Sequence, residues 1–266
     1  MTSVAAPPGV GTLLRSWRQR RGLSQLDLAL KAGVSARHLS FVETGRSRPS
    51  PGMLLHLAEQ LGMPLRDRNL LLLAGGYAPA YGERGLEEPE MGPVREALDK
   101  LLRGHEPYPA VVVDRHWGLV SANRSLGFLM EGIAPHLLEP PINVLRAGLH
   151  PEGLAPRILN LGEWRAHVLE RLARQVVTSG DPALAALHAE LAAYPGGDPA
   201  VPHDPAPGEI ALSLRLQVGA AELAFISTVT TFGTPADVSV SELAIESFFP
   251  ADAATAAAVQ GYFDAL

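Results

Sequence analysis

The sequence predicts two domains: an N-terminal all-α domain of five helices, followed by a C-terminal α+β domain with an antiparallel sheet. The length of 266 residues leaves room for two domains of ordinary size. Apolar residues recur at helical spacing up to about residue 76, whereas strand-like runs begin at residue 109. Residues 75–92 separate the two patterns, and their Gly, Pro and charged residues are typical of a linker.

Five amphipathic segments predict the helices of the first domain, at 10–21, 25–32, 36–44, 51–61 and 65–74. Ser24, Ser35 and Ser50 each stand directly before one of them, where a hydroxyl can accept a hydrogen bond from the free N–H groups of the first turn. Gly33 ends the second helix, in a left-handed conformation that glycine adopts without strain. The residues that we expect in the core around the second and third helices are Leu26, Ala29, Leu30, Val34, Leu39 and Val42.

The second and third segments, joined by a tight glycine turn, have the outline of a helix-turn-helix, whose second helix lies in the major groove of DNA. The residues of this helix left pointing outward are Arg37, His38, Ser40, Phe41 and Thr44. Arginine can pair bidentately with guanine, and an apolar side chain can contact a thymine methyl group. An exposed phenylalanine among Arg and His therefore fits a groove-reading face better than a solvated one.

Residues 10–75 resemble the phage-repressor-like helix-turn-helix of the xenobiotic-response-element type. The resemblance implies that Gln25 contacts phosphate, that the outward residues early in the third helix read bases, and that the following loop binds phosphate. It also implies a buried ion pair between Arg18 and Glu43, which we expect to support the scaffold. The candidate DNA-binding residues are Gln25, Ser35, Ala36, Arg37, His38, Ser40, Phe41, Thr44, Arg46 and Arg48. Two alternatives remain open: Arg46 and Arg48 are no more than solvated charges of the loop, or His38 packs against its neighbours instead of reading bases.

Charge is divided unevenly along the chain. Residues 1–76 hold ten Arg and Lys against four Asp and Glu, and residues 77–266 hold twelve against twenty-four. The basic first part suits a DNA-binding domain, whereas phosphate would repel the acidic remainder. Cysteine is absent, which suits a cytoplasmic location. We see no signal peptide and no apolar run near the roughly 18 residues that span a bilayer, so we expect no membrane partner.

The region between the domains carries one further helix. We expect residues 1–76 to form the DNA-binding domain, 77–104 the linker and a connecting helix, and 105–266 the second domain. Tyr77 and Tyr81 are candidates for anchoring the linker to the first domain. The helix near 93–104, with its face of Val94, Leu98, Leu101 and Leu102, is our candidate for carrying a signal between the domains.

The second domain reads as two strands, a helical insert and three strands. The predicted strands are 110–114, 119–122, 210–218, 222–231 and 243–249. Predicted helices lie at 124–131, 142–147, 161–179, 181–193 and 251–263, and residues 195–208 read as a loop. An antiparallel sheet in this order can enclose a pocket against its helices, and the order resembles a PAS-like sensor fold.

Phrases in this half, HEPYPAVVVDRHWGLVSAN at 105–123 among them, resemble the MmyB-like ligand-binding domain of bacterial transcription regulators. Similar phrases occupy 143–172 and 230–252. The resemblance implies a PAS-like fold that binds a small lipophilic effector, with fatty-acid-like molecules as candidates. The candidate ligand-binding residues are Asn143, Arg146, His150 and Trp164. Alternatively, Asn143 caps a helix, Arg146 forms an internal salt bridge, and Trp164 belongs to the core.

Enzyme and metal signatures are missing from the sequence. Its nine histidines form no HExxH array, and it contains no GxxxxGK[ST], GxGxxG or GxSxG motif. We therefore expect no catalysis, no cofactor and no metal. The sequence predicts a transcriptional regulator that binds operator DNA as a homodimer and senses a small-molecule effector. The alternative is an antitoxin-like DNA-binding protein whose acidic second domain binds a protein partner.

Overall fold

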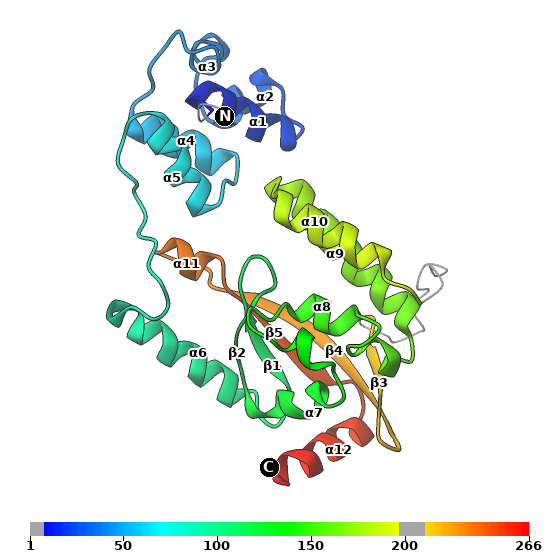
Figure 1. The fold of residues 1–266 in the computed structure, drawn as a ribbon. Coiled ribbons are helices and arrows are strands. Elements are labelled where there is room, and N and C mark those ends of the chain that lie inside the picture. Colours follow the sequence, from blue (N-terminus) through cyan, green and yellow to red (C-terminus); the bar gives the residue numbers. More distant parts are fainter. Residues whose placement is uncertain (1–7, 197–210, 266) are drawn as a thin grey trace, which may run out of the picture. The chain divides into compact units, whose positions relative to one another are not determined.

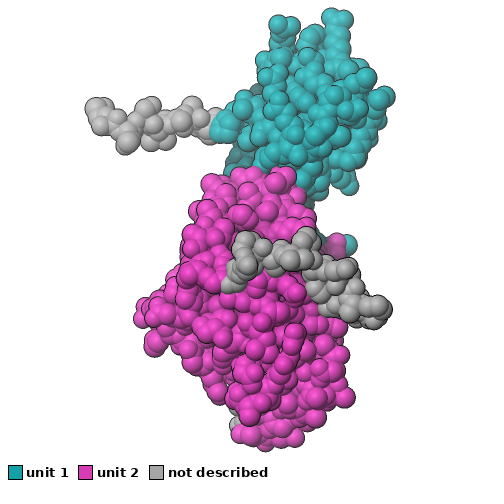
Figure 2. All heavy atoms as spheres, turned by 90° about the vertical axis from the view of Figure 1, so that its right-hand side faces the viewer, with its two compact units in different colours: residues 1–85, 234–241 teal, residues 86–233, 242–266 magenta. Residues whose placement is uncertain are grey.

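The computed structural model describes residues 8–196 and 211–265. These residues form two compact units, coloured separately in Figure 2. The first unit comprises the chain up to Gly85 together with Thr234–Ser241, and the second comprises Leu86–Gly233 with Glu242–Leu266. A short segment from the C-terminal half therefore completes the N-terminal unit, which the sequence did not predict.

The first unit is all-α, as predicted. Its helices are α1 (Val10–Arg20), α2 (Gln25–Lys31), α3 (Ala36–Glu43), α4 (Pro51–Gln60), α5 (Leu65–Ala74) and the short α11 (Val238–Ser241), shown in Figure 1. The predicted caps are present: the Ser35 hydroxyl accepts a hydrogen bond from His38 N at 3.1 Å, and that of Ser50 accepts one from Met53 N at 3.3 Å. Ser24 and Asp27 cap each other's backbone N–H groups. These bonds fix where α2, α3 and α4 begin.

The core of the first unit differs from the prediction in α2. Leu28 and Ala29 are buried there, whereas Leu26 and Leu30 are 58% and 72% exposed. The expectation of inward-facing Leu26 and Leu30 was therefore wrong. The stretch from Leu26 to Leu30 is apolar on both sides of the helix, so spacing alone does not identify the inner face. In α3 the predicted inward residues, Leu39 and Val42, are both buried.

Segment 234–241 is held to the first unit by specific contacts. Val238 is fully buried, and its N–H donates to Gly82 O at 2.8 Å. The Asp237 carboxylate, also buried, pairs with Arg84 at 3.4 Å. Tyr77 anchors the preceding stretch by donating from its hydroxyl to Pro49 O at 2.9 Å. Residues 77–84 and α11 are thus integral to this unit.

The second unit is α+β with a five-stranded antiparallel sheet, as predicted. Its strands are β1 (Ala110–Val113), β2 (Leu119–Ala122), β3 (Leu214–Val218), β4 (Ala221–Thr231) and β5 (Ala244–Pro250). They lie in the order β2-β1-β5-β4-β3, so the last strand inserts between the two hairpins. The predicted first residue of the third strand, Ile210, and most of the predicted loop 195–208 lie outside the described residues.

The sheet has an apolar layer on each face, because successive side chains of a strand point to opposite sides. Ala110 and Val112 of β1 pack with Leu98 and Leu102 of α6 (Gly92–Gly104). The predicted α6 face was wrong only at one position, since Leu101 is 50% exposed. Helix α6 therefore covers one face of the sheet within the second unit.

The opposite face of the sheet packs against the remaining helices and carries the larger core. These helices are α7 (Gly127–Met130), α8 (Val144–Leu149), α9 (Leu161–Ser179), α10 (Pro182–Ala193) and α12 (Ala253–Asp264). Short 3-10 turns lie among them at Arg124–Leu126, Pro135–Leu137 and Ala155–Arg157, and another precedes α6 at Pro89–Met91. Figure 1 shows α9 and α10 as an antiparallel pair. No helix of the described residues is both long and apolar enough to cross a membrane.

Candidate nucleic-acid interface and apolar cavity

Helix α3 presents one face to the core and another to solvent. Leu39, Val42 and Glu43 are buried, whereas Arg37 is exposed and Phe41 is half-buried. The Arg37 guanidinium lies 5.4 Å from the centre of the Phe41 ring. The predicted outward residues Ala36, His38 and Ser40 are also partly exposed, and Ser35 is exposed. A continuous surface of arginine, aromatic and small side chains therefore lies along α3.

The buried side of this motif is fixed by ion pairing. Arg18 Nε lies 2.7 Å from Glu43 Oε1, and its Nη2 donates to Oε2 at 2.9 Å, which confirms the ion pair that the family resemblance implied. Gln25 Nε2 donates to the same Oε2 at 2.8 Å. Burial alone would raise the pKa of Glu43, but the hydrogen bonds from Arg18 and Gln25 outweigh it, so the pKa lies below its usual range. Gln25, the candidate phosphate contact, is thereby held at the start of α2.

The loop after α3 contains the remaining candidate phosphate contacts. Thr44 donates from its hydroxyl to Ser40 O at 2.7 Å, so this hydroxyl caps its own helix. Arg48 donates to Gly75 O at 3.3 Å and lies over the Tyr77 ring at 5.6 Å. Arg46 is exposed. Two cationic side chains therefore lie beside the end of α3, one of them positioned by the linker.

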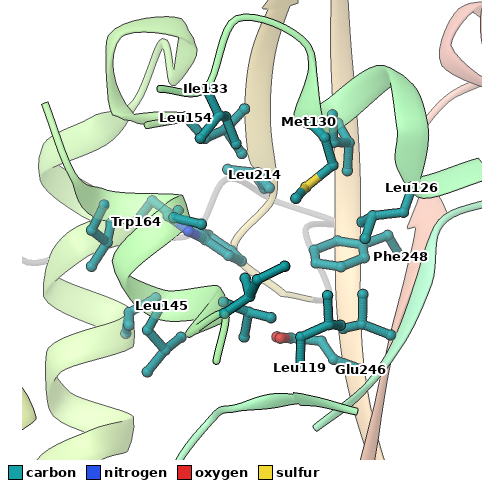
Figure 3. A pocket seen from close by; sticks show the side chains of 18 of the residues that line it. Leu119, Leu126, Met130, Ile133, Leu145, Leu154, Trp164, Leu214, Glu246 and Phe248 are labelled. Atoms are coloured by element: carbon teal, nitrogen blue, oxygen red, sulfur yellow. The ribbon is translucent and has the colours of Figure 1, made fainter. Parts of the chain in front are cut away.

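The second unit contains a cavity between the sheet and the helices α7–α9. Its volume is about 100 Å³. The lining is almost wholly aliphatic and aromatic, and comprises Val111, Leu119, Leu126, Leu129, Met130, Ile133, Ile142, Val144, Leu145, Ala147, Gly148, Leu149, Leu154, Trp164, Val168, Arg171, Leu214, Glu246 and Phe248. Figure 3 shows Trp164 and Leu145 on one side of the cavity and Phe248 and Leu126 on the other. A lining that is mostly apolar and carries a few polar groups is typical of small-molecule sites.

Periodicity explains which residues reach the cavity. Trp164, Val168 and Arg171 follow one another at intervals of four and three along α9, so they share one helix face. Glu246 and Phe248 are two residues apart on β5, so they share one sheet face. The two charged groups, Arg171 and Glu246, were not singled out from the sequence. Only the pairing of α9 with β5 brings them together.

Of the four candidate ligand residues, the structure places Trp164 in the cavity lining and the other three elsewhere. Asn143 caps α8 by accepting from Leu145 N and Arg146 N, at 3.2 and 3.1 Å. Arg146 makes a two-point ion pair with Glu190 at 2.7 and 2.8 Å. The His150 ring packs edge-on to Tyr194, with ring centres 5.0 Å apart. Asn143 and Arg146 thus have the structural roles that were the alternatives to ligand binding.

One group of side chains in the described residues has the spacing of metal ligands. The ligand atoms of His136, His150 and Glu152 lie within 4.8 Å of one another. The Nδ1 atom of His150, however, accepts a hydrogen bond from the Glu152 backbone N–H at 3.1 Å. A neutral histidine with Nδ1 as acceptor carries its proton on Nε2, so neither nitrogen is open to an ion without rearrangement. We assign no metal to this group.

Comparison with known proteins matches both units to families. Residues 94–261 match the MmyB-like transcription regulator ligand binding domain, and residues 14–67 match a helix-turn-helix family. No curated protein matches the sequence. The first match includes every residue that lines the cavity, and the second includes α2 and α3 with their connecting turn.

Proposed function

The chain belongs to the family of MmyB-like transcription regulators, and we propose that it binds a specific operator on double-stranded DNA and releases or strengthens this binding when a small lipophilic effector enters the cavity. The observation that supports effector sensing is the apolar cavity inside the matched ligand-binding domain. The exposed surface of α3 supports DNA recognition. This activity belongs in the cytoplasm, where the operator is accessible.

In our proposal α3 enters the major groove with Arg37, His38, Ser40 and Phe41 near the bases. Arg46 and Arg48 neutralise phosphates beside it. One such module buries little DNA surface, so we propose a homodimer that binds two half-sites about one helical turn apart.

We propose that the signal passes through the segment that connects β5 to α11. Strand β5 carries Glu246 and Phe248 in the cavity wall and begins at Ala244, three residues after α11 ends. Helix α11 in turn belongs to the DNA-binding unit, through Val238 and the pair Asp237–Arg84. A displacement of β5 around a bound effector would therefore be transmitted along the chain to α11 and so to the first unit. We prefer this route to α6, our candidate from sequence, because residues of β5 line the cavity and residues of α6 do not.

An effector can change DNA affinity only if it binds the DNA-competent and incompetent states unequally. The proposal is tested by native mass spectrometry of the purified protein, followed by selection of binding sites from random duplex DNA with and without the co-purified molecule. A lipophilic adduct that shifts operator affinity supports sensing. A ligand-free dimer that binds DNA but captures a defined protein partner would favour the antitoxin-like alternative.

The signalling route is tested with Asp237→Asn, which removes the charge pairing with Arg84. The variant should bind the effector with unchanged affinity, whereas the effector-induced change in operator affinity should shrink. Glu90→Gln, at an exposed acid in the segment before α6, is the matched control and should behave as wild type. An undiminished response in Asp237→Asn would remove this contact from the route.

A further inference from the structure

The cavity has one polar spot, and that spot is electrically neutral. Arg171 and Glu246 are the charged residues in its lining, and their Nη1 and Oε1 atoms lie 3.0 Å apart. Their side chains are only 16% and 6% exposed. None of the remaining lining residues carries a charged side chain. The spot therefore offers a paired cation and anion side by side, rather than a single uncompensated charge.

The pair retains unused hydrogen-bonding capacity on both members. Within the described residues, Arg171 is the side chain that donates to the Glu246 carboxylate, and its bond goes to Oε1. The second carboxylate oxygen is left as an acceptor. The guanidinium of Arg171 lies over the Trp117 ring, 4.4 Å from its centre. Figure 3 shows the Glu246 carboxylate reaching from β5 towards the cavity.

The charge balance decides which ligands fit. A carboxylate would be attracted by Arg171 but repelled by Glu246, and an ammonium group would be attracted by Glu246 but repelled by Arg171. Either one would bring a net charge into an apolar cavity, which is costly when no free counter-charge is present. A hydroxyl group is neutral, donates one hydrogen bond and accepts two. It can donate to Glu246 Oε2 and accept from an N–H of Arg171 at the same time.

We infer that the effector is a small uncharged molecule with an apolar body and one hydroxyl group, of the phenol or short-chain alcohol class. This inference rests on the proposed function of the cavity and names the chemistry of its ligand. The volume of about 100 Å³ is smaller than the cavity of about 150 Å³ that holds benzene, so the ligand can be no larger than a single ring or a short chain. In this assignment Trp164 and Phe248 contact the apolar body, and the Arg171–Glu246 pair selects the hydroxyl.

The test compares four probes of similar shape on the full-length protein by isothermal titration calorimetry: phenol, toluene, benzylamine and benzoate. Phenol should bind about tenfold or more tightly than toluene, because a hydrogen bond to a charged group adds to the same apolar contact. Benzylamine and benzoate should both bind more weakly than phenol. Equal affinity for phenol and toluene, or tightest binding of either ion, would overturn the assignment while leaving the cavity a ligand site.

Variants distinguish the contribution of the Arg171–Glu246 pair to ligand binding from that of the apolar lining. Glu246→Gln should remove the preference for phenol over toluene and bring benzoate above phenol, because Arg171 then lacks its counter-charge. Glu170→Gln removes an exposed acid from the same helix and is the matched control. If none of the four probes binds the wild-type protein, the proposed cavity function fails and the ligand class with it. The wild-type comparison stands even if Glu246→Gln does not fold.

Discussion

Arg18 and Glu43 form a two-point ion pair that is buried between α1 and the last residue of α3. Their side chains are 9% and 0% exposed. A carboxylate at the C-terminal end of a helix is unfavourable with respect to the helix dipole, so Glu43 depends on Arg18 for compensation. The half-exposed Arg15 adds a third, longer contact at 3.6 Å. This pair sets the position of the proposed recognition helix without touching its outer face.

Glu43→Ala should destabilise the first unit by about 3–5 kcal/mol, because it leaves the buried Arg18 without its partner. Thermal unfolding followed by circular dichroism measures the loss. Glu59→Ala, at an exposed acid on α4, is the control and should leave the melting temperature nearly unchanged. A variant as stable as wild type, with only DNA binding lost, would show that Glu43 acts in recognition rather than in the scaffold.

Gly11 lies where α1 crosses the end of α3. A Cβ atom at this position would lie 2.2 Å from the carbonyl oxygen of Glu43, which is a backbone atom and cannot move aside cheaply. Gly11→Ala should therefore destabilise the first unit by about 1–3 kcal/mol or more. Gly52→Ala in α4 meets no atom within 4 Å and should be neutral or stabilising. Chemical denaturation of the two variants gives the comparison, and equal stabilities would contradict this account.

Arg37→Ala should weaken binding to the selected operator by about 1–3 kcal/mol and relax specificity at one base pair. The reason is the exposed position of Arg37 near the start of α3. Fluorescence anisotropy on operators with single substitutions measures both effects, with Arg103→Ala on α6 as the control. A uniform loss on every sequence, with a smaller salt dependence, would identify Arg37 as a phosphate contact instead.

His167 makes the stability of the second unit depend on pH. Burial, followed by the charges of Arg171 and Arg174, lowers the pKa of His167 below its usual value. The unfolded chain therefore takes up this proton at higher pH than the folded one, so stability falls as the pH drops below about 6.5. Denaturation between pH 7.5 and 5.5 should show a shallower fall for His167→Gln than for wild type. Val177→Ala, at an exposed position of α9 that carries no titratable group, should retain the wild-type slope, and identical slopes for all three proteins would refute the assignment.

The elements that could be predicted are those whose signal is local. Ser24, Ser35 and Ser50 cap helices in the structure as predicted, because a cap depends only on the first turn of its own helix. The five-stranded antiparallel sheet followed from alternating runs and short turns. The inner face of α2 was misassigned, since Leu26, Leu28 and Leu30 are chemically alike and only packing distinguishes them.

Residue patterns alone predicted the class of each unit and the position of α3, and the family resemblance predicted the pair Arg18–Glu43. The polar spot of the cavity could not be predicted, because Arg171 and Glu246 are 75 residues apart and are brought together only by the fold. The place of α11 in the DNA-binding unit could not be predicted either. Both facts depend on long-range contacts, and no local pattern of residue types encodes which distant segments pack together.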